Sequence, residues 1–419
     1  MSTPYFDLLI IGAGAAGLGA VLHATHQGFR AVVLEAKGRV GGRAYTDTRS
    51  LGYPFDLGCH WLHSADQNPL TSLALEGGFS VEATPKPSKL SVDGAATVSI
   101  DPESAWRRDA EAQLERISRF GDEGLTLAAE AFSRPETASK TAFEGWFSML
   151  NGTGTGNICA RDHSRYMDTG ENWVTPVGYG AVIAAQFKPF NVRLNHEVRR
   201  ITLHRRHVQV DGNGFQFVAG AVILTVSTGV LANGGLVVEP GFEARKMRAL
   251  AALPLGYAER VGFLLPEGFS YPPVDEPDDQ NLLTTLGDTA VSFQIRPGGY
   301  PIVSAYFGGW HAASLARSGP PALVSEAIRH FKTGTGRSLA GLRAIASSWT
   351  TDPHVRGAYS TARPLTANSG FNPREVLAEP VAGKLFFAGE ATSERAYSTA
   401  HGAFQSGIRA AEEVRKALG

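Results

Sequence analysis

The feature that most constrains the fold lies at the start of the chain. A short apolar run, residues 8–11, stops at a Gly-x-Gly-x-x-Gly motif formed by Gly12, Gly14 and Gly17. Small and apolar residues continue at helical spacing to about residue 27, where Gly28 is placed to end the helix. This order of strand, glycine-rich turn and helix is typical of a dinucleotide-binding unit.

A second apolar run completes this unit. Residues 31–34 read as a buried strand, and an acidic residue, Glu35, follows directly. In such units the first glycine makes a tight turn, the second lets the backbone approach a pyrophosphate, and the third lets helix and strand pack closely. The helix N-terminus holds the phosphates and the acid binds a ribose. The residues predicted to bind the cofactor here are Gly12, Gly14, Ala15, Gly17, Glu35 and Ala36.

The C-terminal region repeats this arrangement. Residues 385–388 read as a buried strand, Gly389 and Glu390 break it, and a helix is predicted from about His401 to Lys416. We therefore expect one nucleotide-binding domain that is assembled from both ends of the chain.

Between the two ends the pattern is less regular. We expect short strands in residues 81–100, a helix from 104 to about 119 capped by Asp101 or Ser104, and a β-rich stretch over 192–225. A hairpin turn is expected at residues 211–214. Loops are expected at residues 151–156 and 271–279.

Charge and composition exclude several classes of function. The 419 residues contain 39 Lys and Arg against 40 Asp and Glu, so the net charge is −1. Proteins that bind nucleic acid or anionic membranes usually carry a basic excess, and we expect neither partner. Residues 215–238 lack charge but contain four glycines, which favours a strand and loop over a membrane span.

The two cysteines, Cys59 and Cys159, are too few for a disulfide framework or a cysteine-based zinc site. His60 and His63 lack further metal ligands nearby, so no metal site is predicted. The first residues show no basic segment followed by a cleavage site, and we expect a cytoplasmic protein.

Five ordered motifs carry a family resemblance. Residues 35–46, with Arg39, Gly41, Gly42 and Arg43, resemble the second signature of two-domain flavoproteins of the amine oxidase type. Residues 56–69, 172–180, 349–360 and 387–403 resemble later blocks of the same family. The family includes polyamine oxidases, monoamine oxidases and histone lysine demethylases, and the segment around Trp61 and His63 is most similar to that of polyamine oxidases.

The resemblance implies an α/β fold with two domains. A Rossmann-like FAD-binding domain would consist of residues 1–84, 186–243 and 381–419. A substrate-binding domain with a mixed sheet and helices would consist of residues 85–185 and 244–380. The catalytic site is expected between the two domains.

FAD is the cofactor that the resemblance implies. The residues implied to bind it, beyond those of the first unit, are Arg39, Gly41, Gly42, Arg43, Trp61, Val198, Trp349, Gly389, Glu390, Thr399 and Ala400. The cysteine through which monoamine oxidases attach their flavin falls at Ala358, so the resemblance implies non-covalent FAD.

The family transfers a hydride equivalent from the carbon beside an amine to flavin N5, which gives an imine that hydrolyses. By motif position, Tyr359 and Thr399 would occupy the two positions that flank the amine in this family, and His63 would orient substrate or accept a proton. The leading expectation is oxidation of an aliphatic amine, a polyamine or a related primary or secondary amine, with O2 reduced to H2O2. Candidate carboxylates for a second amine are Asp168, Glu171, Asp275, Glu276, Asp278 and Asp279.

One position departs from the family pattern. Most members carry a lysine after a Pro-x-Gly turn, linked through water to flavin N5, and this chain has Arg260 there. In the family this lysine is implicated in reoxidation of the flavin by O2, and a planar guanidinium does not replace a single ammonium, so the resemblance does not imply rapid reaction with O2. An amine dehydrogenase or desaturase that uses another acceptor is therefore an alternative.

Two further alternatives are open. An L-amino-acid oxidase would need a cation for the substrate carboxylate, for which Arg260, Arg296 and Arg356 are candidates. A flavin-binding protein without catalysis would not be reduced by any amine. The partners expected are a small-molecule amine and O2, and the oligomeric state is left open.

Overall fold

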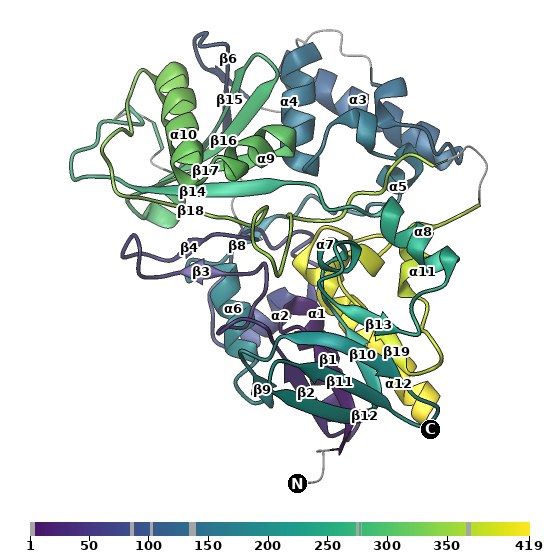
Figure 1. Cartoon of the computed structure of the whole chain (residues 1–419). Coiled ribbons are helices and arrows are strands. Elements are labelled where there is room, and N and C mark those ends of the chain that lie inside the picture. Colours follow the sequence, from purple (N-terminus) through teal and green to yellow (C-terminus); the bar gives the residue numbers. More distant parts are fainter. Residues whose placement is uncertain are drawn as a thin grey trace.

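The computed structural model describes residues 5–83, 88–100, 104–133, 140–273, 276–277, 279–365 and 370–419. Two sheets, one below the other in Figure 1, organise these residues. The lower sheet has eight strands: β1 (Tyr5–Ile11), β2 (Ala31–Leu34), β9 (Val192–Arg193), β10 (Val198–Leu203), β11 (Val208–Gly212), β12 (Phe215–Leu224), β13 (Val237–Glu239) and β19 (Leu385–Phe387).

The centre of the lower sheet is parallel. β1 lies between β2 and β12, with Leu8 opposite both Ala31 and Ala221. β12 is long enough to pair with β11 along its first half and with β19 along its second half. The strands β1, β2 and β19 therefore end at the same edge, because parallel strands point the same way.

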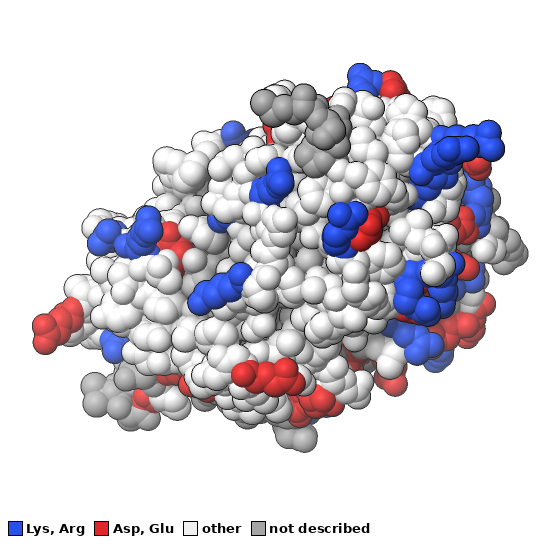
Figure 2. Space-filling model, turned by 90° about the horizontal axis from the view of Figure 1, so that it is seen from below, with Lys and Arg blue, Asp and Glu red and all other residues white. Residues whose placement is uncertain are grey.

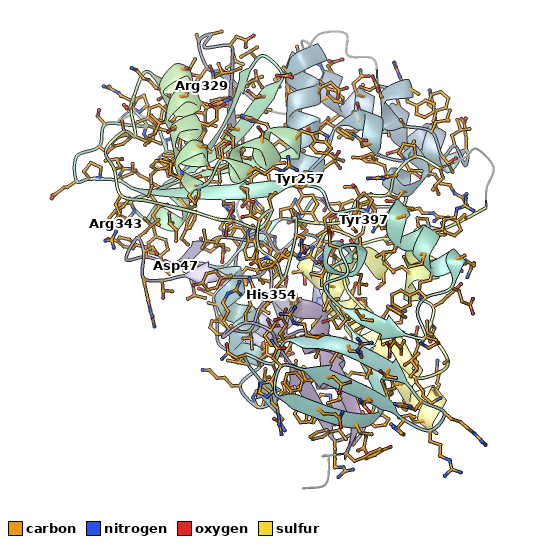
Figure 3. The ribbon with its side chains drawn as sticks, in the orientation of Figure 1. Asp47, Tyr257, Arg329, Arg343, His354 and Tyr397 are labelled. Atoms are coloured by element: carbon orange, nitrogen blue, oxygen red, sulfur yellow. The ribbon has the colours of Figure 1, made fainter. Side chains whose placement is uncertain are left out.

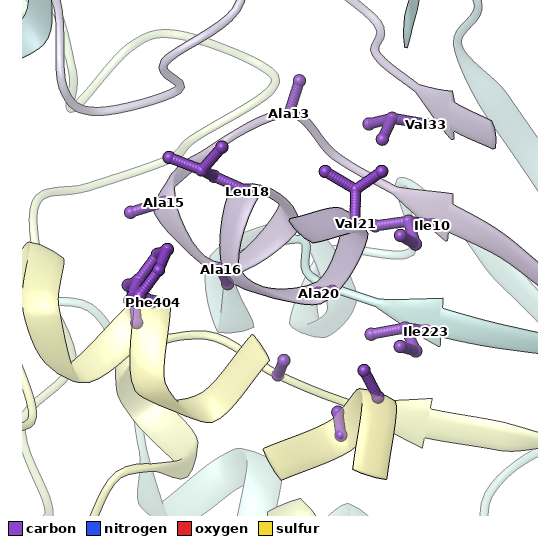
Figure 4. Packing of buried hydrophobic residues seen from close by; sticks show 14 of the residues in the cluster. Ile10, Ala13, Ala15, Ala16, Leu18, Ala20, Val21, Val33, Ile223 and Phe404 are labelled. Carbon is purple, nitrogen blue, oxygen red and sulfur yellow. The ribbon is translucent and has the colours of Figure 1, made fainter. Parts of the chain in front are cut away.

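Four helices cover one face of this sheet: α1 (Ala15–His26), α2 (Pro69–Glu76), α6 (Tyr179–Gln186) and α12 (Ala400–Leu418). Figure 4 shows the buried contact between α1 and α12, where Phe404 packs beside Ala15 and Ala16. A Cβ added to Gly19 would lie 2.1 Å from the Phe404 carbonyl oxygen, and one added to Gly407 would lie 2.0 Å from that of Ala16. Glycine is required at both positions because the two helices cross with their backbones in contact.

The upper sheet has the order β18 (Ala344–Ala346), β14 (Ala258–Leu264), β17 (Ile302–Gly308), β16 (Thr289–Ile295), β15 (Gln280–Leu286), β6 (Ser88–Val92) and β7 (Val98–Ser99). On one face, apolar residues that include Phe263, Phe293 and Phe307 pack against α9 (Gly309–Arg317) and α10 (Pro320–Thr335). Beyond the other face lie α3 (Ala105–Asp122) and α4 (Lys140–Asn151), of which α4 contacts β15, β16 and β17.

The remaining elements are short. They comprise the pairs β3 (Thr46–Asp47) with β4 (Phe55–Asp56) and β5 (Glu82–Ala83) with β8 (Trp173–Val174), and the helices α5 (Ala160–Ser164), α7 (Thr228–Ala232), α8 (Ala244–Ala252) and α11 (Pro373–Ala378). Single 3-10 turns occur at Ala129–Ala131, Thr155–Asn157, Pro297–Gly299 and Glu390–Thr392.

The predicted elements agree with this structure in most places. The terminal strand–helix units and the hairpin turn at residues 211–214 are confirmed, as are the short strands within residues 81–100. Ser104 caps α3 by accepting from the Arg107 N–H, while Asp101 lies outside the described residues. The expected loop at 151–156 is in part helical, because α4 extends to Asn151 and a 3-10 turn begins at Thr155. The α/β fold class is confirmed.

The strands of each sheet come from separate parts of the sequence. Those of the lower sheet lie within residues 5–34, 192–239 and 385–387, and those of the upper sheet within residues 88–99 and 258–346. The helix α6 packs with Tyr179 and Ile183 in the core of the lower sheet, although it was assigned by sequence mainly to the second domain. The expected domain boundaries otherwise stay a prediction.

Acidic and basic side chains are dispersed over the surface seen from below, among larger uncharged areas (Figure 2). Of the described helices, none has the length and apolar character needed to cross a membrane.

Candidate active site

A cavity of about 1000 Å³ lies where the edge of the lower sheet meets the upper sheet. All but two of the predicted site residues line this cavity. They are Gly12, Gly14, Ala15, Glu35, Ala36, Gly41, Gly42, Arg43, Trp61, His63, Val198, Arg260, Trp349, Tyr359, Gly389, Glu390, Thr399 and Ala400. Gly17 and Arg39 are absent from the wall. His354, labelled in Figure 3, also lies on this wall, in the segment between the sheets.

The glycine-rich turn after β1 forms one end of the cavity. Gly12 has a φ of +109°, and a Cβ there would lie 2.5 Å from the Thr225 hydroxyl. A Cβ on Gly17 would lie 2.1 Å from the Gly12 carbonyl oxygen, so this glycine serves the packing of α1 on β1 rather than the cavity wall. Gly14 forms a parallel bridge with Gly41, which places the second glycine-rich segment directly beside the first.

Glu35 follows β2 and is only 8% exposed. Its carboxylate accepts hydrogen bonds from the Ala13 N–H at 2.8 Å and from the Lys37 N–H at 2.9 Å. These bonds hold the carboxylate at the cavity wall, where its remaining lone pairs can accept bonds from hydroxyl groups such as those of a ribose.

Arg43 and Glu390 connect the two ends of the chain. The Arg43 guanidinium lies 3.0 Å from Glu390 Oε1, and the Ser360 hydroxyl donates to Glu390 Oε2 at 2.7 Å. Burial opposes ionisation of Glu390, but the charge of Arg43 and the bond from Ser360 outweigh it, so the pKa of Glu390 lies below its usual value. The carboxylate is therefore ionised at neutral pH.

Arg39 stands apart from the cavity. Its guanidinium lies 4.1 Å from the centre of the Tyr45 ring and 5.9 Å from that of Trp349, and it donates to the Val40 carbonyl. Because Trp349 lines the cavity and Arg39 does not, Arg39 acts here as support for that wall.

His63 lies on the cavity wall, and one of its ring nitrogens forms a hydrogen bond with another side chain. Its Nδ1 faces the Asn172 side-chain oxygen, an acceptor, so Nδ1 carries the proton and Nε2 is an acceptor. Burial lowers the pKa of His63, and the bond to Asn172 only partly offsets this. The imidazole is thus neutral and able to accept a proton or a hydrogen bond at neutral pH.

Tyr359 has a partner that sequence reasoning missed. Its hydroxyl lies 2.7 Å from the Tyr306 hydroxyl and donates to the Leu150 carbonyl at 2.8 Å. Since each hydroxyl has one proton, Tyr306 donates to Tyr359. Burial raises the pKa values of both phenols, so both stay neutral.

Thr399 is the residue before α12. Its hydroxyl accepts from the Gly402 N–H at 3.0 Å and donates to the Ala396 carbonyl at 2.6 Å. The hydroxyl therefore caps the helix, and the part of Thr399 left for the cavity is its apolar side.

A second histidine, His60, also lines the cavity. Asp56 Oδ2 accepts from its Nδ1 at 2.9 Å, while Nε2 is buried without a hydrogen-bond partner. Burial and the nearby charge of Arg260 lower the pKa of His60. The described residues contain no group of three or more potential ligands that would hold a metal ion.

The carboxylates predicted for a second substrate amine lie elsewhere. Asp168 accepts from the Gly170 N–H and Glu171 from the Trp173 indole, and neither lines the cavity. Glu276 pairs with Lys89, and Asp279 accepts from the Gly298 N–H. Asp275 and Asp278 lie outside the described residues.

The wall opposite the predicted cofactor residues comes from segments in which the sequence showed no motif. The aromatic and apolar members are Trp106, Ala110 and Leu114 of α3, Trp146 and Met149 of α4, and Leu283 and Tyr306 of the upper sheet. The rings of Trp106 and Trp146 meet edge to face at 5.2 Å. In the sequence the α3 residues show only helical spacing, which is equally typical of core residues.

Comparison with known proteins adds to this geometry. The sequence model of the flavin-containing amine oxidoreductases matches residues 15–415 of the chain. The chain belongs to this family. Like other flavin-containing amine oxidoreductases, it uses FAD as its cofactor.

Two relatives and one solved structure show the range of this amine oxidoreductase family. The chain is 28% identical to polyamine oxidase 3 of Oryza sativa subsp. japonica, over 97% of this chain and 88% of that protein. It is 25% identical to human lysine-specific histone demethylase 2, over 97% of this chain and 53% of that protein. An engineered putrescine oxidase has the same fold, with a TM-score of 0.80, 17% identity, and coverage of 99% of this chain and 100% of that one.

The residues of this amine oxidoreductase fit FAD. The close approach of Gly14 and Gly41 leaves backbone without side chains at the N-terminus of α1, where a diphosphate is favoured. Arg43 adds a positive charge and Glu35 an acceptor for hydroxyl groups at the same wall.

Proposed function

We propose that this chain oxidises an aliphatic primary or secondary amine at the carbon beside nitrogen, giving an imine that water hydrolyses to an aldehyde and an amine or ammonia. The observation that carries the proposal is the make-up of the cavity. Residues that fit FAD form one wall, and aromatic and apolar side chains from α3, α4 and the upper sheet form the other.

The apolar wall prepares the amine for oxidation. An alkylammonium must lose a proton before the adjacent carbon can give up a hydride, and an apolar environment favours the neutral amine. The faces of Tyr306, Tyr359 and the two tryptophans still attract the incoming cation. Neutral His63 offers an Nε2 lone pair that accepts the departing proton or orients the amine.

When bound, FAD would supply the two-electron acceptor for this oxidation, and we propose O2, reduced to H2O2, as the final electron acceptor. The substitution of Arg260 for the usual lysine supports a second candidate, an amine dehydrogenase that passes the electrons to another acceptor. We also propose a cytoplasmic location.

Anaerobic mixing of the FAD-loaded protein with a panel of amines tests the proposal. The panel contains polyamines, the compounds in the names of the relatives, together with monoamines and amino acids. We expect at least one member to bleach the flavin absorption within seconds. Bleaching by no member of the panel would contradict the proposed function. Admission of air after bleaching then distinguishes an oxidase from a dehydrogenase. Rapid return of the flavin absorption together with H2O2 indicates an oxidase, and slow return indicates a dehydrogenase.

A further inference from the structure

Arg260 is exceptional among the cations of the cavity. The seven Lys and Arg residues on the wall include five that form ion pairs: Lys37 with Asp352, Arg43 with Glu390, Lys89 with Glu276, Arg107 with Glu111 and Arg199 with Glu197. Arg356 is exposed to solvent. Arg260 is only 7% exposed, and it forms an ion pair with no residue that the structure describes.

Neutral groups hold the Arg260 side chain in place. Its Nη2 donates to Gln294 Oε1 at 2.8 Å and to the Ser304 hydroxyl at 2.9 Å, whereas Nε is buried without a partner. Asp56 is the carboxylate whose charge acts most strongly on Arg260, but it is already bonded to His60, Thr46 and two backbone N–H groups. The guanidinium thus keeps donor capacity toward the cavity.

A row of polar side chains leads away from Arg260 across the upper sheet. Ser304, Gln294, Asn281 and Ser88 lie directly opposite one another on β17, β16, β15 and β6. All four line the cavity, so they point from the same face of the sheet. This row faces the apolar residues of α3 and α4, and on the sheet side of the cavity it adds polar groups beside Leu283 and Tyr306.

The same cavity offers little to a second ammonium group. The described acidic residues on its wall are Glu35, Glu111, Glu197 and Glu390, and each is engaged, the first by backbone N–H groups and the others by arginines. A substrate with two positive ends would also be repelled by the buried positive charge of Arg260, which has no ion-pair partner among the described residues.

We propose that the amine oxidised by this protein also carries a carboxylate, and that Arg260 binds this group with Gln294 and Ser304 as positioning residues. This proposal rests on the proposed function and specifies its substrate class. A guanidinium and a carboxylate match in plane and charge, and such bonds are about twice as strong as neutral ones. Pairing also relieves the cost of burying a cation that has no carboxylate partner.

The first test compares matched amines in anaerobic flavin reduction by the FAD-loaded protein. One set is butylamine, putrescine and 4-aminobutanoate, which differ only at the end remote from the amine. The second set is 3-methylbutylamine and L-leucine, which differ only by a carboxylate on the reacting carbon. We expect the carboxylate-bearing member of at least one set to give the fastest bleaching. Faster bleaching by an amine without a carboxylate in both sets would overturn the proposal.

The second test measures binding and needs no turnover. Butanoate is titrated into the FAD-loaded protein and followed through the flavin absorption spectrum, with butanamide as the neutral match. We expect saturable binding of butanoate and about 100-fold weaker binding of butanamide. Equal binding of the two compounds, or no binding of butanoate, would contradict the role of Arg260. If no amine bleaches the flavin while butanoate binds as expected, the proposed function fails and the anion site stands.

Substitutions of Arg260 test whether this residue is responsible for butanoate binding. Arg260→Gln should weaken butanoate binding about 100-fold, and Arg260→Lys should weaken it less, because a charge remains without the planar fork. Arg107→Gln, which alters a cavity cation that already has a carboxylate partner, should leave butanoate binding within about 3-fold of the unchanged protein. An equal loss in Arg260→Gln and Arg107→Gln would refute the proposal. Should Arg260→Gln fail to fold, the butanoate and butanamide comparison in the unchanged protein decides.

Discussion

The hydroxyl groups of Tyr306 and Tyr359 lie 2.7 Å apart, although one residue is in a central strand of the upper sheet and the other in the segment that returns toward the lower sheet. The Tyr306 O–H donates a hydrogen bond to the Tyr359 hydroxyl oxygen, and the Tyr359 O–H donates one to the Leu150 carbonyl. This chain of bonds fixes the ring of Tyr359 on the cavity wall and links the two halves of the site.

Removal of the first bond in this chain should loosen Tyr359. We expect Tyr306→Phe to lower kcat/KM for the best amine about 5-fold, which corresponds to about 1 kcal/mol for one neutral hydrogen bond. Steady-state kinetics of the FAD-loaded variant provide the measurement. Tyr300→Phe, which alters a tyrosine outside this cavity, is the control. Equal kinetics for Tyr306→Phe and the unchanged protein would show that the ring is held by packing alone.

Glu35 should contribute to FAD affinity through its carboxylate. Glu35→Gln preserves the size of the side chain but places an NH2 group where only acceptors fit, and we expect the Kd for FAD to rise at least about 10-fold. The measurement is a fluorescence titration of the apoprotein with FAD, with thermal unfolding of the apoprotein to correct for altered stability. Glu197→Gln, at a carboxylate of the same cavity that pairs with Arg199, should change the Kd little.

Non-covalent FAD is a second prediction about the cofactor. Ala358 occupies the position of the linking cysteine, and alanine has no group that attaches to a flavin. Precipitation of the holoprotein in acid should therefore leave the yellow colour in the supernatant. Flavin that stays with the pellet would show attachment through another residue.

The buried Glu390 carboxylate should make stability depend on pH. Its folded pKa lies below the unfolded value, so its stabilising effect is present above about pH 4.5 and is lost as the pH falls through the folded pKa. We expect Glu390→Gln to lower the free energy of unfolding by about 3 kcal/mol at pH 7 and by less below pH 4, as denaturant titrations at both pH values would show.

An exposed pair provides the comparison for Glu390. Glu379 pairs with Arg245 at the surface, where both side chains are about half exposed. Glu379→Gln should cost less than about 1 kcal/mol at either pH. A similar cost for the two variants would mean that the buried pair contributes no more than a surface pair.

The crossing of α1 and α12 should not tolerate a methyl group. In Gly19→Ala the new Cβ would lie 2.1 Å from the Phe404 carbonyl oxygen, so the helices must separate. We expect a loss of about 3 kcal/mol in the free energy of unfolding. Gly154→Ala is the matched control, since Gly154 has a φ of −72° and no atom within 4 Å of an added Cβ. Equal stability of the two variants would show that the helices adjust freely.

Local patterns predicted the cofactor side of the molecule well. β1, α1 and β2 follow one another directly, so hydrophobic spacing and the glycines Gly12, Gly14 and Gly17 indicated the unit without tertiary information. Gly389 and Glu390 form a second contiguous signal, because only Ala388 separates them from the end of β19. Contiguous motifs are visible in a single sequence.

The substrate side was not predictable in the same way. Gln294 and Ser304 become neighbours only through the antiparallel register of β16 and β17, and Arg260 joins them through β14. No local signal specifies which strands pair or in which register, and Trp106 and Trp146 had the spacing of ordinary core residues. The partner of Tyr359 was missed for this reason.

The order in which the sheet is assembled matters during synthesis. The first helix of the chain packs against the last, and β12 receives β19 only after the whole upper sheet has been made. While the ribosome is still translating, the nascent chain therefore exposes the apolar face of α1 and one flank of β12. These surfaces are open to chaperones and to aggregation until residues 385–418 emerge, and the cavity wall that includes Gly389, Glu390 and Thr399 is completed only with that segment.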